Sequence, residues 1–131
     1  MELYVGGIGQ GKLDYVRKKY SEALVYDEDS YEKLYLLDET EQVVIWNHFH
    51  KMVRAELDKG KTPEQILSEV TRVADKIAGI VIISDEIGNG IVPMEKKERI
   101  YREETGRILI EIAERAERVE RIICGISQRI K

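Results

Sequence analysis

The sequence predicts an α/β fold in a single domain, residues 1–131, built on a mostly parallel sheet. Short runs of β-branched and apolar residues, such as residues 43–46 and 80–83, alternate with longer stretches of helical periodicity. The runs are apolar throughout, as expected of strands that helices cover on both faces. We therefore expect strands and helices to alternate along the chain in layers.

The expected strands are residues 3–5, 23–26, 43–46, 80–83 and 119–124. Helices are expected over residues 13–22, from about Met52, from Thr62 and over residues 95–117. Thr62 marks a helix start because its hydroxyl can cap free amides, Pro63 suits the first turn and Gln65 can complete a capping box. Residues 27–42 have no clear periodicity, and their role stays open.

Burial in the sheet is expected for Val5, Val44, Ile45, Ile80, Val81, Ile82, Val119 and Ile122. Cys124 ends the last expected strand, where it should be a small core residue. As the one cysteine of the chain it cannot form an internal disulfide, so nothing argues for secretion.

Charge and hydropathy exclude several classes of partner. The net charge is −4, the opposite of what binding to a phosphate backbone favours, so nucleic acid is not expected. The longest apolar run, residues 78–83, is far shorter than the roughly 20 residues of a membrane span. No membrane contact is expected, and the protein is expected to be cytoplasmic.

The most informative motif follows the first expected strand. Gly6-x-x-x-x-Gly11-Lys12 matches the phosphate-binding loop pattern, in which backbone amides turn toward phosphate oxygens and the lysine reaches the outer phosphates. Its place between a strand and a helix favours a P-loop NTPase-like, three-layer fold over a mere glycine-rich turn. The predicted nucleotide-binding residues, for GTP or ATP, are Gly6, Gly7, Gly9, Gln10, Gly11, Lys12 and Leu13.

The pattern fails at its last position. Leu13 stands where Ser or Thr would offer a hydroxyl to Mg²⁺, and an aliphatic side chain cannot ligate magnesium. Nucleotide binding is therefore expected to gain little from Mg²⁺.

Two further motifs resemble one family, the adenosylcobinamide kinase / adenosylcobinamide-phosphate guanylyltransferases of cobalamin biosynthesis. Ser84-Asp85-Glu86-Ile87-Gly88-Asn89-Gly90-Ile91-Val92-Pro93 resembles the family's (T/S)-N-E-V-G-x-G-I-V-P, and Arg99-x-Tyr101-Arg102-Glu103-x-x-Gly106-Arg107 resembles its R-x-(F/Y)-R-D-x-x-G-R. The resemblance covers residues 79–131 and, through the loop, residues 1–20. It implies a nucleotide and a corrinoid as ligands and a homo-oligomer as the assembly.

Departures from the family pattern bear on activity. Asn47 lies where the family carries an acidic residue near Mg²⁺, and Leu109-Ile110 replaces an Asn-Gln pair. The family's guanylylated histidine belongs to a segment after the second strand, but residues 27–42 contain no histidine. The resemblance thus implies a shortened, diverged member in which guanylyl transfer through histidine is not expected.

The candidate catalytic residues are Lys12, for charge neutralisation, and Glu86, for placing a metal. Contacts with substrate or phosphate are expected from Asn47, His48, His50, Asp85, Arg99 and Arg102. His48 and His50 would share one side of an extended strand end, as metal or phosphoryl ligands or as one packed and one solvated side chain. Two histidines make an incomplete metal site, so no metal site is assigned.

Three functions remain open. The chain is a slow phosphotransferase acting from GTP or ATP on a corrinoid hydroxyl, a non-catalytic regulatory or partner-binding protein on a degenerate scaffold, or a subunit whose partner supplies the missing groups. The loss of a hydroxyl and a carboxylate from one Mg²⁺ site favours the second, non-catalytic function, because phosphoryl transfer relies on the charge neutralisation that this ion provides.

Overall fold

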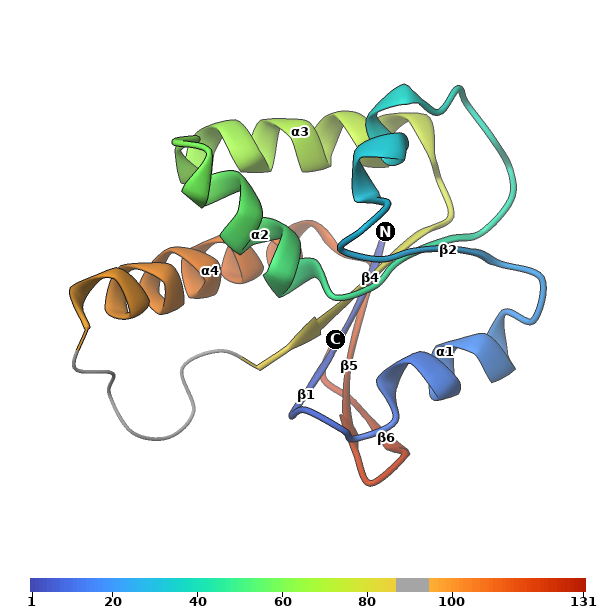
Figure 1. Ribbon diagram of the computed structural model, residues 1–131. Helices are drawn as coiled ribbons and strands as arrows, with labels where there is room; N and C mark the ends of the chain where they lie inside the picture. The colour runs from blue at the N-terminus through green and yellow to red at the C-terminus, as the bar shows by residue number, and fades with distance from the viewer. Residues whose placement is uncertain (87–94) are drawn as a thin grey trace.

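A computed structural model describes residues 1–86 and 95–131 of the chain. Its centre is a six-stranded sheet of order β2-β3-β4-β1-β5-β6 (Figure 1). The first five strands are parallel, and β6 joins the edge antiparallel to β5. The predicted loop of residues 87–93, with part of the family-like motif, lies outside the described residues.

The first five strands along the chain agree with the apolar runs of the sequence to within one or two residues. The strands of the sheet are β1 (Glu2–Gly6), β2 (Leu24–Tyr26), β3 (Val44–Trp46), β4 (Ile80–Asp85), β5 (Arg118–Ile123) and β6 (Ile126–Arg129). The register sets Gly6 beside Asp85 at the carboxyl ends of β1 and β4. Because β1 and β4 are neighbours, the glycine loop and the end of β4 meet at one edge of the sheet.

The helices are α1 (Lys12–Lys19), α2 (Phe49–Asp58), α3 (Pro63–Lys76), α4 (Lys96–Arg115) and the 3-10 helix η1 (Tyr31–Leu36). One sheet face packs on α2, α3, α4 and η1, and the other on α1 (Figure 1). Neighbouring residues alternate between the faces: Val44 and Trp46 lie in the larger cluster, and Ile45 in the smaller one. The predicted three-layer α/β fold is confirmed.

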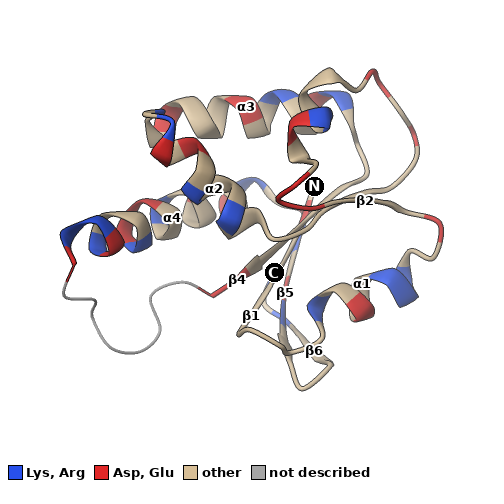
Figure 2. Cartoon of the chain, in the orientation of Figure 1, with Lys and Arg blue, Asp and Glu red and all other residues tan. Residues whose placement is uncertain are grey.

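The start of α3 is confirmed in detail. The Thr62 side chain accepts a hydrogen bond from the Gln65 amide, and the Gln65 side chain accepts one from the Thr62 amide. This capping box satisfies two amides that the first helical turn leaves unpaired. Ile66, Val70 and Val73 are then buried against the sheet. Acidic and basic residues are both present along α3 and α4 (Figure 2).

Residues 27–42 contain η1, which joins the core through a buried carboxylate on α2. Glu56 is fully buried, and its Oε1 accepts a hydrogen bond from the Tyr31 hydroxyl at 2.7 Å. Lys61 pairs with the other oxygen, Oε2, at 2.6 Å. Burial alone would raise the pKa of Glu56, but the hydrogen bonds from Lys61 and Tyr31 outweigh it and lower the pKa.

Two expectations at the strands are wrong, and one strand was not predicted. Val5 is only half-buried, because it lies next to an open groove beside α4. Cys124 is exposed, since the chain turns back at Cys124–Gly125 to form β6 and gives Cys124 a left-handed φ of 50°. Strand β6 itself was not predicted, because three of its four residues are exposed and only Ser127 is half-buried.

No helix in the described part of the chain combines the length and apolar composition that crossing a membrane requires.

Replacement of Glu56 by Gln should lower the free energy of unfolding by about 3 kcal/mol, because it leaves Lys61 near a buried group that carries no charge. Glu32→Gln, an exposed neighbour that also pairs with a lysine, should change it by less than about 0.5 kcal/mol. Urea unfolding measures both. Because the folded pKa is lowered, the stabilisation exists above the ordinary pKa near 4.5 and is lost as the pH falls through the folded value.

Equal stability of Glu56→Gln and the parent at pH 7 would contradict this role for the buried carboxylate.

Candidate functional site: a phosphate-binding loop

The glycine loop has the shape that an anion site requires. Gly9 and Gly11 have φ angles of 70° and 85°, values that side chains with a Cβ rarely adopt. A Cβ on Gly6 would overlap the backbone carbonyl of Ile122 on β5, so this position also needs glycine. The loop runs directly into α1, whose first amides lack partners within the helix.

The turn between β5 and β6 holds the loop from outside. Gln10 accepts two hydrogen bonds at 2.8 Å, from the Cys124 amide to its side chain and from the Gly125 amide to its backbone carbonyl. The loop is therefore fixed at its tip by a hairpin that sequence reasoning did not predict.

Lys12 lies beneath the loop and is 7% exposed. Its Nζ donates to the Gly7 carbonyl at 2.7 Å and forms an ion pair with Asp85 Oδ1 at 2.8 Å. Asp85 ends β4, so the ion pair connects two neighbouring strand ends. The lysine thereby presents its charge at the floor of the loop, with a carboxylate beside it.

His50 completes this group from the first turn of α2 and is 6% exposed. Its Nδ1 accepts a hydrogen bond from the Asp85 amide at 3.1 Å, so the ring proton belongs on Nε2, which lies 3.3 Å from Asp85 Oδ2. Burial lowers the pKa of His50 and outweighs the opposing effect of Asp85. At neutral pH the ring is thus uncharged and orients the carboxylate.

A pocket of about 220 Å³ opens over these groups. It is lined by the loop and start of α1 (Ile8, Gly9, Gln10, Gly11, Lys12, Leu13, Asp14) and by Asn47, His48, Lys51 and Asp85. Most of the residues predicted from the loop motif therefore line one hollow at the carboxyl ends of parallel strands, the place where open α/β sheets bind ligands.

The two histidines do not lie on an extended strand end, because β3 ends at Trp46 and the chain turns at once into α2. His48 caps α2 with a left-handed φ of 51°, and its side chain is 39% exposed. The rings still meet edge to face, with centroids 5.8 Å apart. His48 faces the pocket, whereas His50 lies behind Asp85.

Three predicted site residues lie elsewhere. Glu86 forms an ion pair with Arg121 of β5, through Nε–Oε1 at 2.5 Å and Nη2–Oε2 at 3.1 Å, and borders the groove beside α4. Arg99 and Arg102 lie on α4, and neither lines the loop pocket. Asp85, not Glu86, is the carboxylate that reaches Lys12.

Two acidic residues that sequence reasoning passed over lie beside the pocket. Asp27 Oδ1 accepts a hydrogen bond from Asn47 Nδ2 at 2.6 Å, and Glu28 Oε2 lies 2.7 Å from His48 Nδ1. The signal was present in the sequence, since Asp27 and Glu28 follow one strand and Asn47-His48 follow the next. Recognising it required knowing that β2 and β3 are neighbours.

The residues at the expected Mg²⁺ position do not fit that ion. Leu13 lines the pocket without an oxygen, the Asn47 amide is turned toward Asp27, and Asp85 is already neutralised by Lys12. Mg²⁺ needs near-octahedral oxygen ligation. These groups therefore supply no carboxylate or hydroxyl free to hold magnesium against a phosphate.

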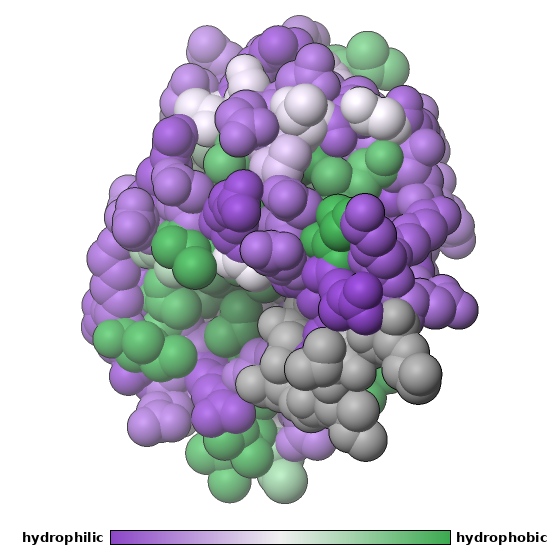
Figure 3. Space-filling view, turned by 90° about the vertical axis from the view of Figure 1, so that its left-hand side faces the viewer, coloured by the Kyte–Doolittle hydropathy of each residue, from purple (hydrophilic) through white to green (hydrophobic). Residues whose placement is uncertain are grey.

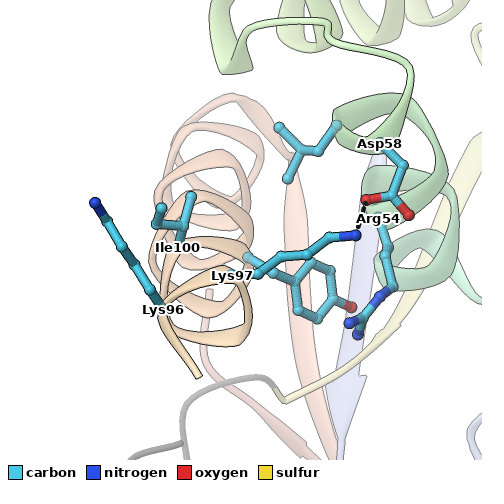
Figure 4. Close-up of a pocket in the computed structure, with 7 residues that line it drawn as sticks. Arg54, Asp58, Lys96, Lys97 and Ile100 are labelled. Carbon is cyan, nitrogen blue, oxygen red and sulfur yellow. Dashed lines mark ion pairs between the residues drawn. The ribbon is translucent and has the colours of Figure 1, made fainter. Parts of the chain in front are cut away.

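A second cavity, of about 360 Å³, lies between α2 and the start of α4 (Figure 4). Its walls are mainly apolar, with Leu57, Ile100 and the Tyr101 ring. Two of its three lining cations are engaged, since Lys97 pairs with Asp58 at 3.4 Å and Arg54 pairs with Glu98; the third is Lys96. It is consequently less suited to phosphate than the loop pocket, although Tyr101 connects the two by donating to the His50 carbonyl at 2.9 Å.

The strand order, the glycine loop and the lysine at its floor define a P-loop-type nucleotide fold. The chain belongs to the cobinamide kinase / cobinamide phosphate guanyltransferase family, whose sequence model matches residues 15–130. That family acts in cobalamin biosynthesis and uses GTP or ATP. No curated protein shows significant similarity to the chain. The family match begins after the glycine loop. The interpretation of the loop as a phosphate site therefore rests on the geometry of the loop and not on the match.

The Lys12–Asp85 ion pair leads to a prediction about the affinity of the loop pocket for anions. Asp85→Asn should tighten the binding of inorganic pyrophosphate, without added metal, about threefold or more, because Lys12 then has no compensating charge beside it. The asparagine oxygen can still accept from His50. Glu86→Gln, which removes the same charge on the next residue, is the control and should have little effect. Calorimetric titration at low salt measures both; unchanged or weaker binding by Asp85→Asn would refute this placement of the lysine charge.

Proposed function

We propose that this chain binds the phosphates of GTP or ATP in the glycine-loop pocket and is a diverged member of its family with slow phosphoryl transfer. The observation that supports it best is Lys12, held at the floor of the loop by Gly7 and Asp85. The loop amides and this ammonium group are the parts that a nucleotide polyphosphate requires.

Each residue has a distinct part in the proposed binding. The glycines let the backbone approach the phosphates, and Lys12 neutralises the outer ones. Asp85 and His50 keep the lysine at the loop when the pocket is empty. Lys51 and His48, on the opposite wall, contribute further polar contacts to a ligand.

The same groups explain why transfer should be slow. Phosphoryl transfer depends on positioning and on cations that neutralise the charge that develops in the transition state. Here Leu13 and Asn47 replace the two Mg²⁺ ligands, and Asp85 offsets the charge of Lys12. A corrinoid hydroxyl remains the acceptor that family membership suggests. No histidine follows β2 in residues 27–42, which argues against guanylyl transfer through this segment.

A second function, partner binding without catalysis, is favoured by an exposed apolar groove. The groove, of about 630 Å³, is bordered by Ile110 and Ile130, which are 62% and 61% exposed. Exposed apolar side chains are also visible among polar ones in the space-filling view (Figure 3). Such a surface fits a homo-oligomer contact or another subunit. Lack of any nucleotide binding would favour this function over the first.

Lys12→Ala should weaken GTP or ATP binding more than tenfold, because it removes the ammonium group at the loop floor. Lys18→Ala, on the exposed side of α1, removes the same charge away from the pocket and should leave affinity within about twofold. Calorimetry provides the affinities, and thermal unfolding verifies that both variants fold. Equal losses in the two variants would show that the loop lysine has no special role.

The double change Leu13→Ser with Asn47→Asp should restore magnesium dependence. It supplies a hydroxyl and a carboxylate at the two positions where the structure has neither, so Mg²⁺ should then tighten GTP or ATP binding at least tenfold. Leu13→Ala with Asn47→Ala is the matched control, since it changes both side chains without adding an anionic oxygen. No gain from Mg²⁺ in a folded Ser/Asp variant would place the defect elsewhere.

A further inference from the structure

Three metal-ligand side chains converge beside the loop pocket: Asp27, Glu28 and His48. One donor atom from each lies within 4.8 Å of the others. His48 Nδ1 is 2.7 Å from Glu28 Oε2 and 3.4 Å from Asp27 Oδ1. All three side chains are partly exposed, so an ion can reach them from solvent.

The backbone fixes this arrangement. Asp27 and Glu28 follow β2, His48 follows β3, and the Asn47 amide donates to the Tyr26 carbonyl at 2.8 Å, which continues the pairing of the two strands. The turn after β2 is closed by Ser30, whose amide donates to the Asp27 carbonyl and whose hydroxyl accepts from the Asp27 amide. The three ligands therefore come from ordered strand ends.

A second layer of side chains orients the carboxylates. Asn47 Nδ2 donates to Asp27 Oδ1 at 2.6 Å, and Lys51 Nζ donates to Glu28 Oε1 at 3.0 Å. The Lys51 contact leaves the other oxygen of Glu28 facing His48, and Asp27 keeps further lone pairs beside its bond to Asn47. Outer-shell hydrogen bonds of this kind are what orient ligands in metal sites.

The spacing suits a small divalent ion. With metal–ligand bonds of about 2.0–2.2 Å, donors in a tetrahedral site lie about 3.3 Å apart. The Asp27–His48 separation of 3.4 Å already meets this value. The shorter Glu28–His48 contact must hold a proton, because both atoms are otherwise acceptors, and an ion would take the place of that proton.

We propose that Asp27, Glu28 and His48 form a binding site for a divalent transition-metal ion such as Zn²⁺ or Co²⁺. The imidazole nitrogen selects these ions over Mg²⁺, which prefers oxygen alone. Because His48 also lines the loop pocket, the ion would lie beside bound phosphates, next to Asn47 but held by ligands other than the two that the loop motif would supply. The site needs no nucleotide, so it stands or falls separately from the proposed function.

Calorimetric titration of the metal-free protein with ZnCl₂, without nucleotide, should show one equivalent bound. Asp27→Asn, Glu28→Gln and His48→Asn should each weaken binding at least tenfold. Asparagine suits the left-handed backbone at position 48 but offers no imidazole. Asp29→Asn removes the same charge from the same turn outside the cluster, and should stay within about twofold.

Co²⁺ provides a readout of the ligand itself. The visible absorption of the Co²⁺ protein should be lost in His48→Asn and kept in Cys124→Ser, which removes the exposed thiol as a competing ligand. Mg²⁺ should bind at least tenfold more weakly than Zn²⁺. Equal affinity of His48→Asn and the parent, or a loss of binding in Cys124→Ser, would overturn the proposal.

Discussion

The ion pair between Lys12 and Asp85 connects every part of the proposed site. It joins the loop after β1 to the end of β4, and through Asp85 it reaches His50 on α2. A buried cation needs a compensating partner, and here the partner lies where a phosphate would bind. The ion pair thereby offsets the charge of Lys12 at the floor of the pocket, and under the proposed function this would limit both the affinity for anions and the stabilisation of a transferring phosphoryl group.

The central strands could be predicted from the sequence, because helices cover both of their faces. Such strands have no solvent-facing positions for polar residues and appear as uninterrupted apolar runs. Val44, Ile45 and Trp46 are all fully buried, and their uninterrupted apolar run predicted β3. Strand β6 and η1 could not be predicted in this way. The first is an exposed edge, and the second is stabilised by the contact of Tyr31 with Glu56, which lies 25 residues away in the chain.

The site was predictable where it depends on local sequence and not where it depends on register. The glycine spacing predicted the loop from neighbouring residues alone, and the structure places Lys12 at the floor of that loop. One residue decides whether a carboxylate at the end of β4 faces the loop, because successive side chains point to opposite faces. Asp85 reaches Lys12, and Glu86 turns to Arg121. Likewise, Asp27 and Glu28 can be recognised as neighbours of the pocket only once β2 is known to lie beside β3.

Family membership shows a nucleotide-using family, and the proposed function adds that this member lacks the usual magnesium ligands at its loop. The most direct test is calorimetric titration of the unmodified protein with GTP and with ATP, each with and without Mg²⁺. The account predicts that at least one nucleotide binds and that Mg²⁺ changes its affinity by less than about threefold. Tightening of tenfold or more by Mg²⁺, or no binding of either nucleotide, would contradict it.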